Sequence, residues 1–478
     1  MKSLRFLVMA VALAAAATPL RAETIRLEGA IDAARLHEIA MSASGLETLD
    51  LSDAVIEAYE GPRLAANRTV HPAATLPAYA LSGLKARKVI LPSTLTAIGD
   101  GALMGAEIEE LTIPASVTEI GRGAFAACRR LRSATLPATV RSIGSHIFSG
   151  CTALTRVRMM SGDVPASTFA GCTVLADVTL AEGLAAIGDD AFAGCTSMQS
   201  VTIPASVRSI GSRAFSRSGI TRADLTACSA LASVGDEAFA HCPSLTSVSL
   251  PASASEMGQG VFFGSGALRS VTLPAKLTTL PPLTFKGAAG IYDATALLHE
   301  GIDSIGTLAM AGMSGASSVT LPSTLRYIAD GAFEGWSSMS LTDATPLRHL
   351  PGLGQGVWDG VEQSKVFLDT DPSVTDLFMA APQWCEFSFD RSGTTQTADA
   401  VSRPSLRVRF DGDMLCIEAS GPIASATLHD LGGIAVATAD AGGETSVTLD
   451  TSHTRAQFFI LSVTLADRSR ATIKLIRQ

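Results

Sequence analysis

Aromatic side chains are scarce in this 478-residue chain: Phe, Trp and Tyr together make up 5% of it. The hydrophobic share is nevertheless 47%, and much of it is alanine. A chain of this length is enough for two or three domains or for one long repeat array. Many small apolar residues with few aromatic ones suit thin, regularly stacked coils better than a large globular core.

Motifs of catalysis and of cofactor binding are absent as well. There is no Gly-x-Ser-x-Gly nucleophile turn and no Cys-x-x-Cys pair. His37 and His299 each precede a glutamate, but neither has the second histidine, four residues on, that a zinc-protease helix needs. The glycine run 352–356 resembles a dinucleotide loop, yet Val357 takes the place of its third glycine. The sequence therefore predicts no catalytic residues, no metal site and no cofactor.

Basic residues are outnumbered, with 36 Lys and Arg against 45 Asp and Glu and a formal charge of −9. An acidic chain without a basic run is a poor nucleic-acid binder. The apolar run from Phe6 to Ala17 is too short for a comfortable membrane span. A basic start before it and the small Ala22 after it predict a secretory signal peptide over residues 1–22. We therefore expect a secreted or cell-surface protein without a membrane span.

What the chain has in abundance is one repeated motif. The stretch ELTIPASVTEIGRGAFAACRRL, residues 110–131, returns as SATLPATVRSIGSHIFSGCTAL from Ser133. Leu103 fills the slot of its phenylalanine one unit earlier, and Trp358 fills a late one. The phenylalanine recurs, every 21 to 24 residues over the first eight copies, as Phe125, Phe148, Phe169, Phe192, Phe215, Phe239, Phe262, Phe285 and Phe333. Such a period predicts a solenoid in which each coil stacks on its neighbours.

One copy shows what a coil does. Residues Ser200 to Ile203 alternate polar and apolar side chains, which predicts a short strand. Pro204 ends the strand because proline has no N–H to donate. Gly211 is expected to allow a backbone turn that a side chain would resist. Phe215 closes the coil with a large core residue. Because one coil buries too little by itself, the array is expected to be stable only when stacked.

The pattern L-x-x-V-T-[LI]-P…I-G-x-x-A-F-x-x-C resembles the BspA-like leucine-rich repeat family of bacterial surface proteins, of the Bacteroidetes type. The resemblance covers residues 46–384. It implies a leucine-rich repeat β-solenoid with a parallel sheet and coils of about 23 residues in a right-handed spiral. It also implies adhesion to host matrix proteins or to other bacteria.

The spacing of the cysteines follows the period of the repeat. Five of the eight cysteines lie three residues after a repeat phenylalanine, so that stacking places them in one column: Cys128, Cys151, Cys172, Cys195 and Cys242. Such a column is expected to be a buried ladder of small apolar side chains. In an exported chain, disulfides between adjacent coils are an alternative, and a metal site is a further one.

The regular array over residues 46–384 has different sequences at its ends. Residues 23–45 predict a cap with a helix at 31–40, and the alternation from Leu46 to Leu51 predicts the first strand. Residues 385–403, which are polar and without apolar rhythm from residue 388 onward, predict a linker.

Two places inside the array break its rhythm. Residues 156–175 are two residues short, and residues 281–316 contain Pro281-Pro282 and then Ala309-Met310 where a phenylalanine is due. Either the repeat has decayed there with a local change of curvature, or the irregular stretch forms a functional kink or loop.

After the linker the pattern changes to six alternating strands joined by Asp-Gly and Gly-Gly turns. This predicts a small all-β sandwich over residues 404–478. Its end, with Leu428 to Gly432 and the basic Lys474 to Arg477, resembles the C-terminal sorting domain of the type IX secretion system. Gly433 and Gln457–Phe459 depart from that pattern. The resemblance implies an export machinery as a partner; otherwise this is a β-sandwich accessory domain.

Outward strand positions carry mostly serine and threonine, and charge interrupts them at one place. The charged residues fall within four consecutive coils and are expected to form one polar patch: Arg156, Arg158, Asp177, Arg222 and Asp224. Arginine suits two-pronged contacts with carboxylates or sulfates. The sequence thus predicts an exported, non-catalytic protein that binds a protein or a glycan through its solenoid face. A structural spacer that presents another module at the cell surface is the first alternative, and an unrecognised enzyme is the second.

Overall fold

The computed structural model describes residues 23–42, 45–60, 70–160, 162–295, 297–389, 406–411, 413–419, 421–430, 434–454, 458–466 and 470–476. The chain falls into two compact units, Met1–Tyr292 with Ile305–Ser314 and Asp293–Ser304 with Gly315–Gln478. The predicted signal peptide lies outside the described residues, as does the predicted linker from residue 390 onward.

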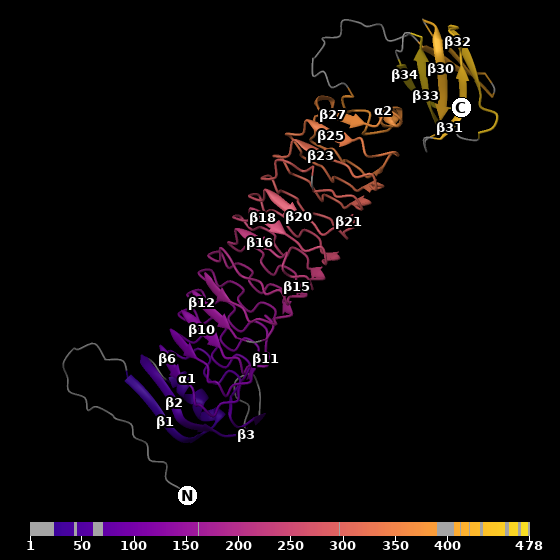
Figure 1. Ribbon diagram of the computed structural model, residues 1–478. Helices are drawn as coiled ribbons and strands as arrows, with labels where there is room; N and C mark the ends of the chain where they lie inside the picture. The colour runs from indigo at the N-terminus through magenta and orange to yellow at the C-terminus, as the bar shows by residue number, and fades with distance from the viewer. Residues whose placement is uncertain are drawn as a thin grey trace. The chain divides into compact units, whose positions relative to one another are not determined.

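The first unit begins with a strand and a helix. β1 (Glu23–Ile31) pairs in parallel with β2 (Leu46–Ile56), and α1 (Ala33–Ser42) connects the two (Figure 1). A short antiparallel pair follows, β3 (Tyr59–Glu60) with β4 (Val70–His71). The helix lies where the sequence predicts one. Sequence reading did not assign β1, although Ile25 and Leu27 alternate with polar residues; it is an edge strand that keeps most of its side chains exposed or half-buried.

The coils of the first unit build two columns of parallel strands (Figure 1). With β1 and β2, the longer strands form a seven-stranded sheet: β6 (Lys88–Ile90), β8 (Glu110–Thr112), β10 (Ser133–Leu136), β12 (Arg156–Met159) and β13 (Asp177–Thr179). The short strands are β5 (Thr75–Leu76), β7 (Ala97–Ile98), β9 (Glu119–Ile120), β11 (Ser142–Ile143), β14 (Ala186–Ile187), β15 (Ser209–Ile210), β17 (Ser233–Val234), β19 (Glu256–Met257) and β21 (Thr279–Leu280). Ser133 pairs with Glu110 on one side and Arg156 on the other, so equivalent residues of successive coils lie side by side.

The prediction of a strand at Ser200–Ile203 is wrong. These residues form no strand, and the column continues beyond them as a separate sheet of β16 (Arg222–Asp224), β18 (Ser247–Ser249) and β20 (Ser270–Thr272). In the next coil, the segment between the phenylalanine and the strand is one residue short, since Arg222 follows Phe215 by seven residues instead of the usual eight. Its turn is tight: a Cβ on Gly219 would lie 2.1 Å from the carbonyl oxygen of Thr196. The strand ladder is interrupted between β13 and β16.

A stack of phenylalanine rings forms the core of the first unit. Neighbouring ring centroids lie 5.2 to 6.2 Å apart, and the ring planes differ by at most 20°, through Phe125, Phe148, Phe169, Phe192, Phe215, Phe239, Phe262 and Phe285. All eight are fully buried, and so are Leu103 before the stack and Met310 after it. The predicted anchors of the repeat are thus its core.

The structural reason for a glycine at position 211 differs from the one that the sequence predicts. Gly211 does not adopt a positive φ. Instead, a Cβ there would lie 2.5 Å from the backbone nitrogen of Asp189 in the preceding coil. Gly144 is placed alike, 2.4 Å from the nitrogen of Arg122. The glycine after the repeat isoleucine therefore allows two coils to approach closely.

The second unit repeats the same coil. Its longer strands form a parallel three-stranded sheet of β23 (Ser318–Thr320), β25 (Leu341–Ala344) and β27 (Phe367–Thr370). Its shorter elements are β24 (Tyr327–Ile328), β26 (Gly352–Leu353), the 3-10 helix η2 (Gln363–Lys365) and α2 (Thr375–Ala380), and β22 (Ser304–Ile305) has one residue in each unit. Trp358 stacks on Phe333 with ring centroids 4.6 Å apart, which confirms its slot. Trp384 packs edge-on against Trp358 and Phe378 at 5.4 and 5.0 Å.

The C-terminal region is antiparallel. Its strands are β28 (Leu406–Asp411), β29 (Met414–Ala419), β30 (Ile423–His429), β31 (Ala435–Asp440), β32 (Ser446–Asp450), β33 (Phe458–Leu465) and β34 (Arg470–Ile476). They form two sheets, β28-β29-β32 and β31-β30-β33-β34, around one cluster that includes Leu415, Leu428 and Phe459. Sequence reading missed β31 because its side chains are small and only half-buried at most. The predicted fold class, a parallel β-solenoid followed by a small all-β region, is confirmed.

Candidate functional site

Arg156 and Asp177 of the predicted patch contact each other. They are register partners on β12 and β13, and Nε of Arg156 donates to Oδ2 of Asp177 at 2.5 Å. Both side chains are about half exposed, at 58% and 48%. An ion pair in this setting contributes little to stability, because water screens it.

Arg158 lies on the same strand without such a partner. Thr135 of β10 and Thr179 of β13 are its register neighbours. All three residues are exposed, and Arg158 makes no ion pair with any residue that the structure describes. An exposed arginine without an ion pair, on a strand between two threonine positions, suits a carboxylate or sulfate group of a ligand.

Arg222 and Asp224 belong to a different sheet, on β16 beyond the break. Oδ1 of Asp224 accepts from Oγ1 of Thr226 at 2.7 Å and from its backbone N–H at 3.1 Å. These hydrogen bonds, the side-chain one first, hold the pKa of Asp224 below its usual value. Asp224 thus closes a local turn. The structure brings three of the five predicted residues together and places the other two on a separate ladder.

A row of ion pairs that sequence reading missed precedes the strands. Glu109 lies 3.6 Å from Arg87 and 3.7 Å from Arg132, and Arg130 lies 3.2 Å from Glu107. The available signal is the alternation of sign at one repeat position, with Arg87, Glu109 and Arg132 each just before a strand. Because these arginines face carboxylates, they are less available to an anionic ligand than Arg158.

The cysteine column is buried, and all eight cysteines of the chain are free thiols. Each thiol of the column donates to a backbone carbonyl oxygen in the preceding coil. For Cys151, Cys172 and Cys195 the acceptor is the repeat phenylalanine, at 3.2, 3.1 and 3.3 Å. Ser265 occupies the same slot and donates to Phe239 at 2.8 Å. The column therefore links coils through hydrogen bonds as well as through packing, which a purely apolar interpretation missed.

Burial makes these thiols unreactive. It raises the pKa of Cys172 to about 12. The pKa of Cys195 also lies well above the usual value, chiefly through burial. A nucleophilic or metal-binding cysteine needs the opposite shift, because the thiolate is the reactive form.

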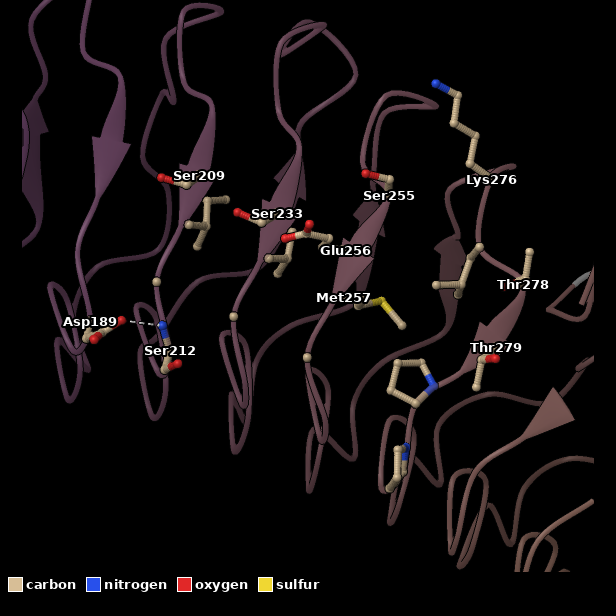
Figure 2. A pocket seen from close by; sticks show the side chains of 18 residues that line it. Asp189, Ser209, Ser212, Ser233, Ser255, Glu256, Met257, Lys276, Thr278 and Thr279 are labelled. Carbon is tan, nitrogen blue, oxygen red and sulfur yellow. Dashed lines mark hydrogen bonds between the residues drawn. The ribbon is translucent and has the colours of Figure 1, made fainter.

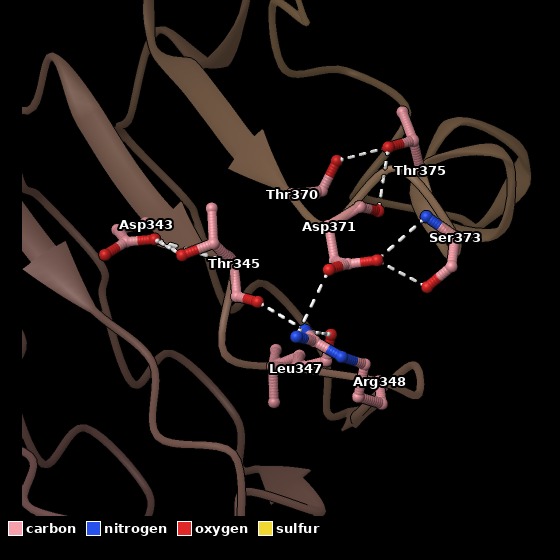
Figure 3. A network of polar contacts seen from close by, with 8 residues as sticks. All are labelled: Asp343, Thr345, Leu347, Arg348, Thr370, Asp371, Ser373 and Thr375. Carbon is pink, nitrogen blue, oxygen red and sulfur yellow. Dashed lines mark hydrogen bonds and ion pairs between the residues drawn. The ribbon is translucent and has the colours of Figure 1, made fainter.

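In the second unit the polar contacts close turns (Figure 3). Oδ2 of Asp371 lies 3.2 Å from the guanidinium of Arg348, which also donates to the carbonyl oxygen of Thr345 at 2.6 Å. Hydrogen bonds from Ser373, the side-chain one first, lower the pKa of Asp371. The carboxylate of Asp371 is thus bound within a turn.

Within the described ranges, no three His, Cys, Asp or Glu side chains are grouped as a metal site would require. No helix in the same ranges is long and apolar enough to cross a bilayer.

Comparison with known proteins bears on the repeats. A model of the BspA type leucine rich repeat region matches residues 71–164, 162–292 and 294–351. Among curated proteins, no match was found.

Several solved structures are similar to this chain. A leucine-rich repeat protein from Bacteroides ovatus has a TM-score of 0.53 and 20% identity, over 68% of this chain and 92% of that one. A leucine rich cell surface protein from Faecalibacterium prausnitzii has a TM-score of 0.32 and 22% identity, over 59% and 86%. A leucine-rich repeat protein from Eubacterium ventriosum has a TM-score of 0.40 and 19% identity, over 77% and 94%. At 20% identity, the similarity to the Bacteroides ovatus protein shows the fold alone.

Proposed function

This chain belongs to the BspA-type leucine-rich repeat family, and on that premise we propose that it is an exported, non-catalytic protein that binds another macromolecule. The binding surface is the outward face of β10, β12 and β13, and the ligand is a protein or a glycan. A solenoid offers a long, shallow face of this kind instead of a deep pocket for a small substrate.

The observation that carries the proposal is the environment of Arg158. This exposed residue lies between two threonine positions on neighbouring strands, while the arginines before the strands face glutamates. A carboxylate or sulfate on the ligand would complete its hydrogen bonds. Arg156 would contribute too, since its pairing with Asp177 is exposed and weak. Arg222 and Asp224 extend the site only to ligands that reach β16.

Export rests on two sequence features. The predicted signal peptide over residues 1–22 directs the chain out of the cytoplasm, and the C-terminal region resembles a type IX sorting domain. Release into the medium or retention at the cell surface follows from these features. The export machinery is then a second partner, through residues 404–478.

The test is binding of the chain from residue 23 onward to immobilised matrix proteins and glycans. Arg158→Ala should weaken a saturable interaction about tenfold, a loss of roughly 1.4 kcal/mol. Arg141→Ala is the matched control, because it removes the same charge from an exposed residue beside β11. Equal losses in both variants would mean that net charge, and not this face, governs binding.

The spacer function makes a different prediction. If the solenoid only holds another module away from the cell, none of the immobilised matrix proteins or glycans binds the folded protein, and Arg158→Ala changes nothing. Thermal unfolding of each variant shows that the protein is folded, so a blank result counts for the spacer.

A further inference from the structure

A groove of about 710 Å³ lies on the other column of strands, over β15, β17 and β19 (Figure 2). Ser209, Ser233 and Glu256 hold one repeat slot in three successive coils, and their side chains line it. Lys276 and Thr278 lie toward its far end (Figure 2). The predicted patch on β12 contributes no residue to this groove.

Glycines keep the groove open. Gly211, Gly235 and Gly258 line it in consecutive coils, and a Cβ on any of them would lie 2.3 to 2.5 Å from the preceding coil. No side chain can therefore fill this row. In the next coil the equivalent position is Pro281, followed by Pro282, and both rings line the groove. The irregularity noted in the sequence thus forms the end of a cavity.

The backbone N–H and C=O groups of these strands already form hydrogen bonds with the neighbouring strands. Ser209 pairs with Ser233, and Ser233 pairs with Glu256, in parallel ladders. An extended peptide therefore cannot join this sheet in the plane of the groove by adding a strand. The hydrogen-bonding groups that remain are side chains, chiefly hydroxyls.

The chemistry of the lining is polar and close to neutral. The hydroxyls of Ser209, Ser233 and Ser255 have no hydrogen-bond partner among the described residues, and each can both donate and accept. The charges of Glu256 and Lys276 oppose each other, and Asp189 already accepts the N–H of Ser212 at 2.7 Å. An anionic ligand finds no net attraction here.

We infer that this groove binds a neutral oligosaccharide that runs across the coils. A sugar chain presents hydroxyls that match those of the serines, and its C–H faces can pack on Met257, Pro281 and Pro282. Neighbouring strands lie about 4.8 Å apart, so a polymer of short repeat can meet one hydroxyl in each coil. The site does not depend on the proposed function of the β12 face.

The experiment is calorimetric titration of the chain from residue 23 onward with hexasaccharides of glucose and of mannose. Ser233→Phe places a ring in the groove and should weaken binding at least tenfold. Ser142→Phe makes the same change in the same repeat slot on β11, outside the groove, and should leave the affinity unchanged. Arg158→Ala should also leave it unchanged, which separates this site from the β12 face.

Ser255→Trp, at an exposed position of the rim, serves as a second blocking variant if Ser233→Phe proves unstable. Three results would overturn the inference: no binding of either hexasaccharide, equal losses in Ser142→Phe and Ser233→Phe, or binding of heparin or an acidic peptide that Ser233→Phe abolishes in place of the neutral sugars.

Discussion

The side chains that face into the coils and those that face outward follow different sequence patterns. Inside, the same residue types recur: eight phenylalanines stack in order, and a glycine follows most of the short strands, where two coils approach closely. Outside, the second outward position of the long strands holds Arg158 in the first unit, but Asp343 and Asp369, as register partners, in the second. The residue types at the inward positions are thus nearly constant, whereas the charge at the outward positions changes sign.

Stacking explains the contrast. An inward side chain must fit the coil before it and the coil after it, so a change there is felt on both sides. An outward side chain meets water and a weak neighbour, so the fold tolerates almost any polar residue there. We therefore expect substitutions inside to lower stability and substitutions outside to alter binding. The following predictions test that division, starting with the largest effect.

Phe192→Ala should cost the most, about 3 to 5 kcal/mol of unfolding free energy. The ring is fully buried and stacks on Phe169 at 5.2 Å and on Phe215 at 5.3 Å, so its removal leaves a cavity between three coils. Hydrogen exchange should show lost protection in the strands beside it. The C-terminal region, which has its own cluster around Phe459, should keep its protection.

Phe459→Ala is the matched control for that experiment. It should lower protection in β29, β30 and β33 and leave the coils around Phe192 as they are. Uniform loss of protection in both variants would contradict the division into regions that are stabilised separately.

Gly144→Ala comes next, with an expected cost of about 3 kcal/mol. The new Cβ would lie 2.4 Å from the backbone nitrogen of Arg122, and neither backbone can move without parting the coils. Gly183→Ala is the control: its φ of +88° strains a side chain, but nothing lies within 4 Å of the new atom. Urea unfolding should give the lower free energy of unfolding for Gly144→Ala. An equal loss would mean that backbone strain, not the approach of coils, sets the glycine pattern.

Sequence reasoning succeeded on the inward column for the same physical reason. Phe125 to Phe285 recur because each ring must fill the same space between the coil before it and the coil after it, and that requirement is visible as a period. It failed where only backbone geometry decides. The break at Ser200–Ile203 leaves no mark in the repeat pattern of those residues, and the role of Gly211 depends on a contact that no local pattern reveals. The predicted patch is divided between two sheets, because spacing in the chain could not show that β16 starts a new sheet.

Alkaline pH should destabilise the inward column. Burial raises the pKa of Cys172 from 9.0 to about 12, so its contribution to stability is complete below pH 9 and is lost as the pH rises toward 12. That single thiol should remove about 1.4 kcal/mol per pH unit in this window. Cys172→Ser keeps a donor for the carbonyl of Phe148, as Ser265 does for Phe239, and should lower this slope. Urea unfolding at pH 8 and at pH 10.5 measures the difference; parallel curves for both proteins would refute it.

The smallest effect should come from Arg156→Ala on the outward column. Its ion pair with Asp177 is half exposed, so its loss should change the unfolding free energy by less than about 0.5 kcal/mol. A double-mutant cycle with Asp177→Ala isolates the pair energy, and raising the salt concentration should reduce it further. If the cycle instead gives more than about 1 kcal/mol, the outward charges help to hold the coils together. Binding losses in Arg158→Ala could then reflect a disturbed fold, and the division between the two columns would no longer hold.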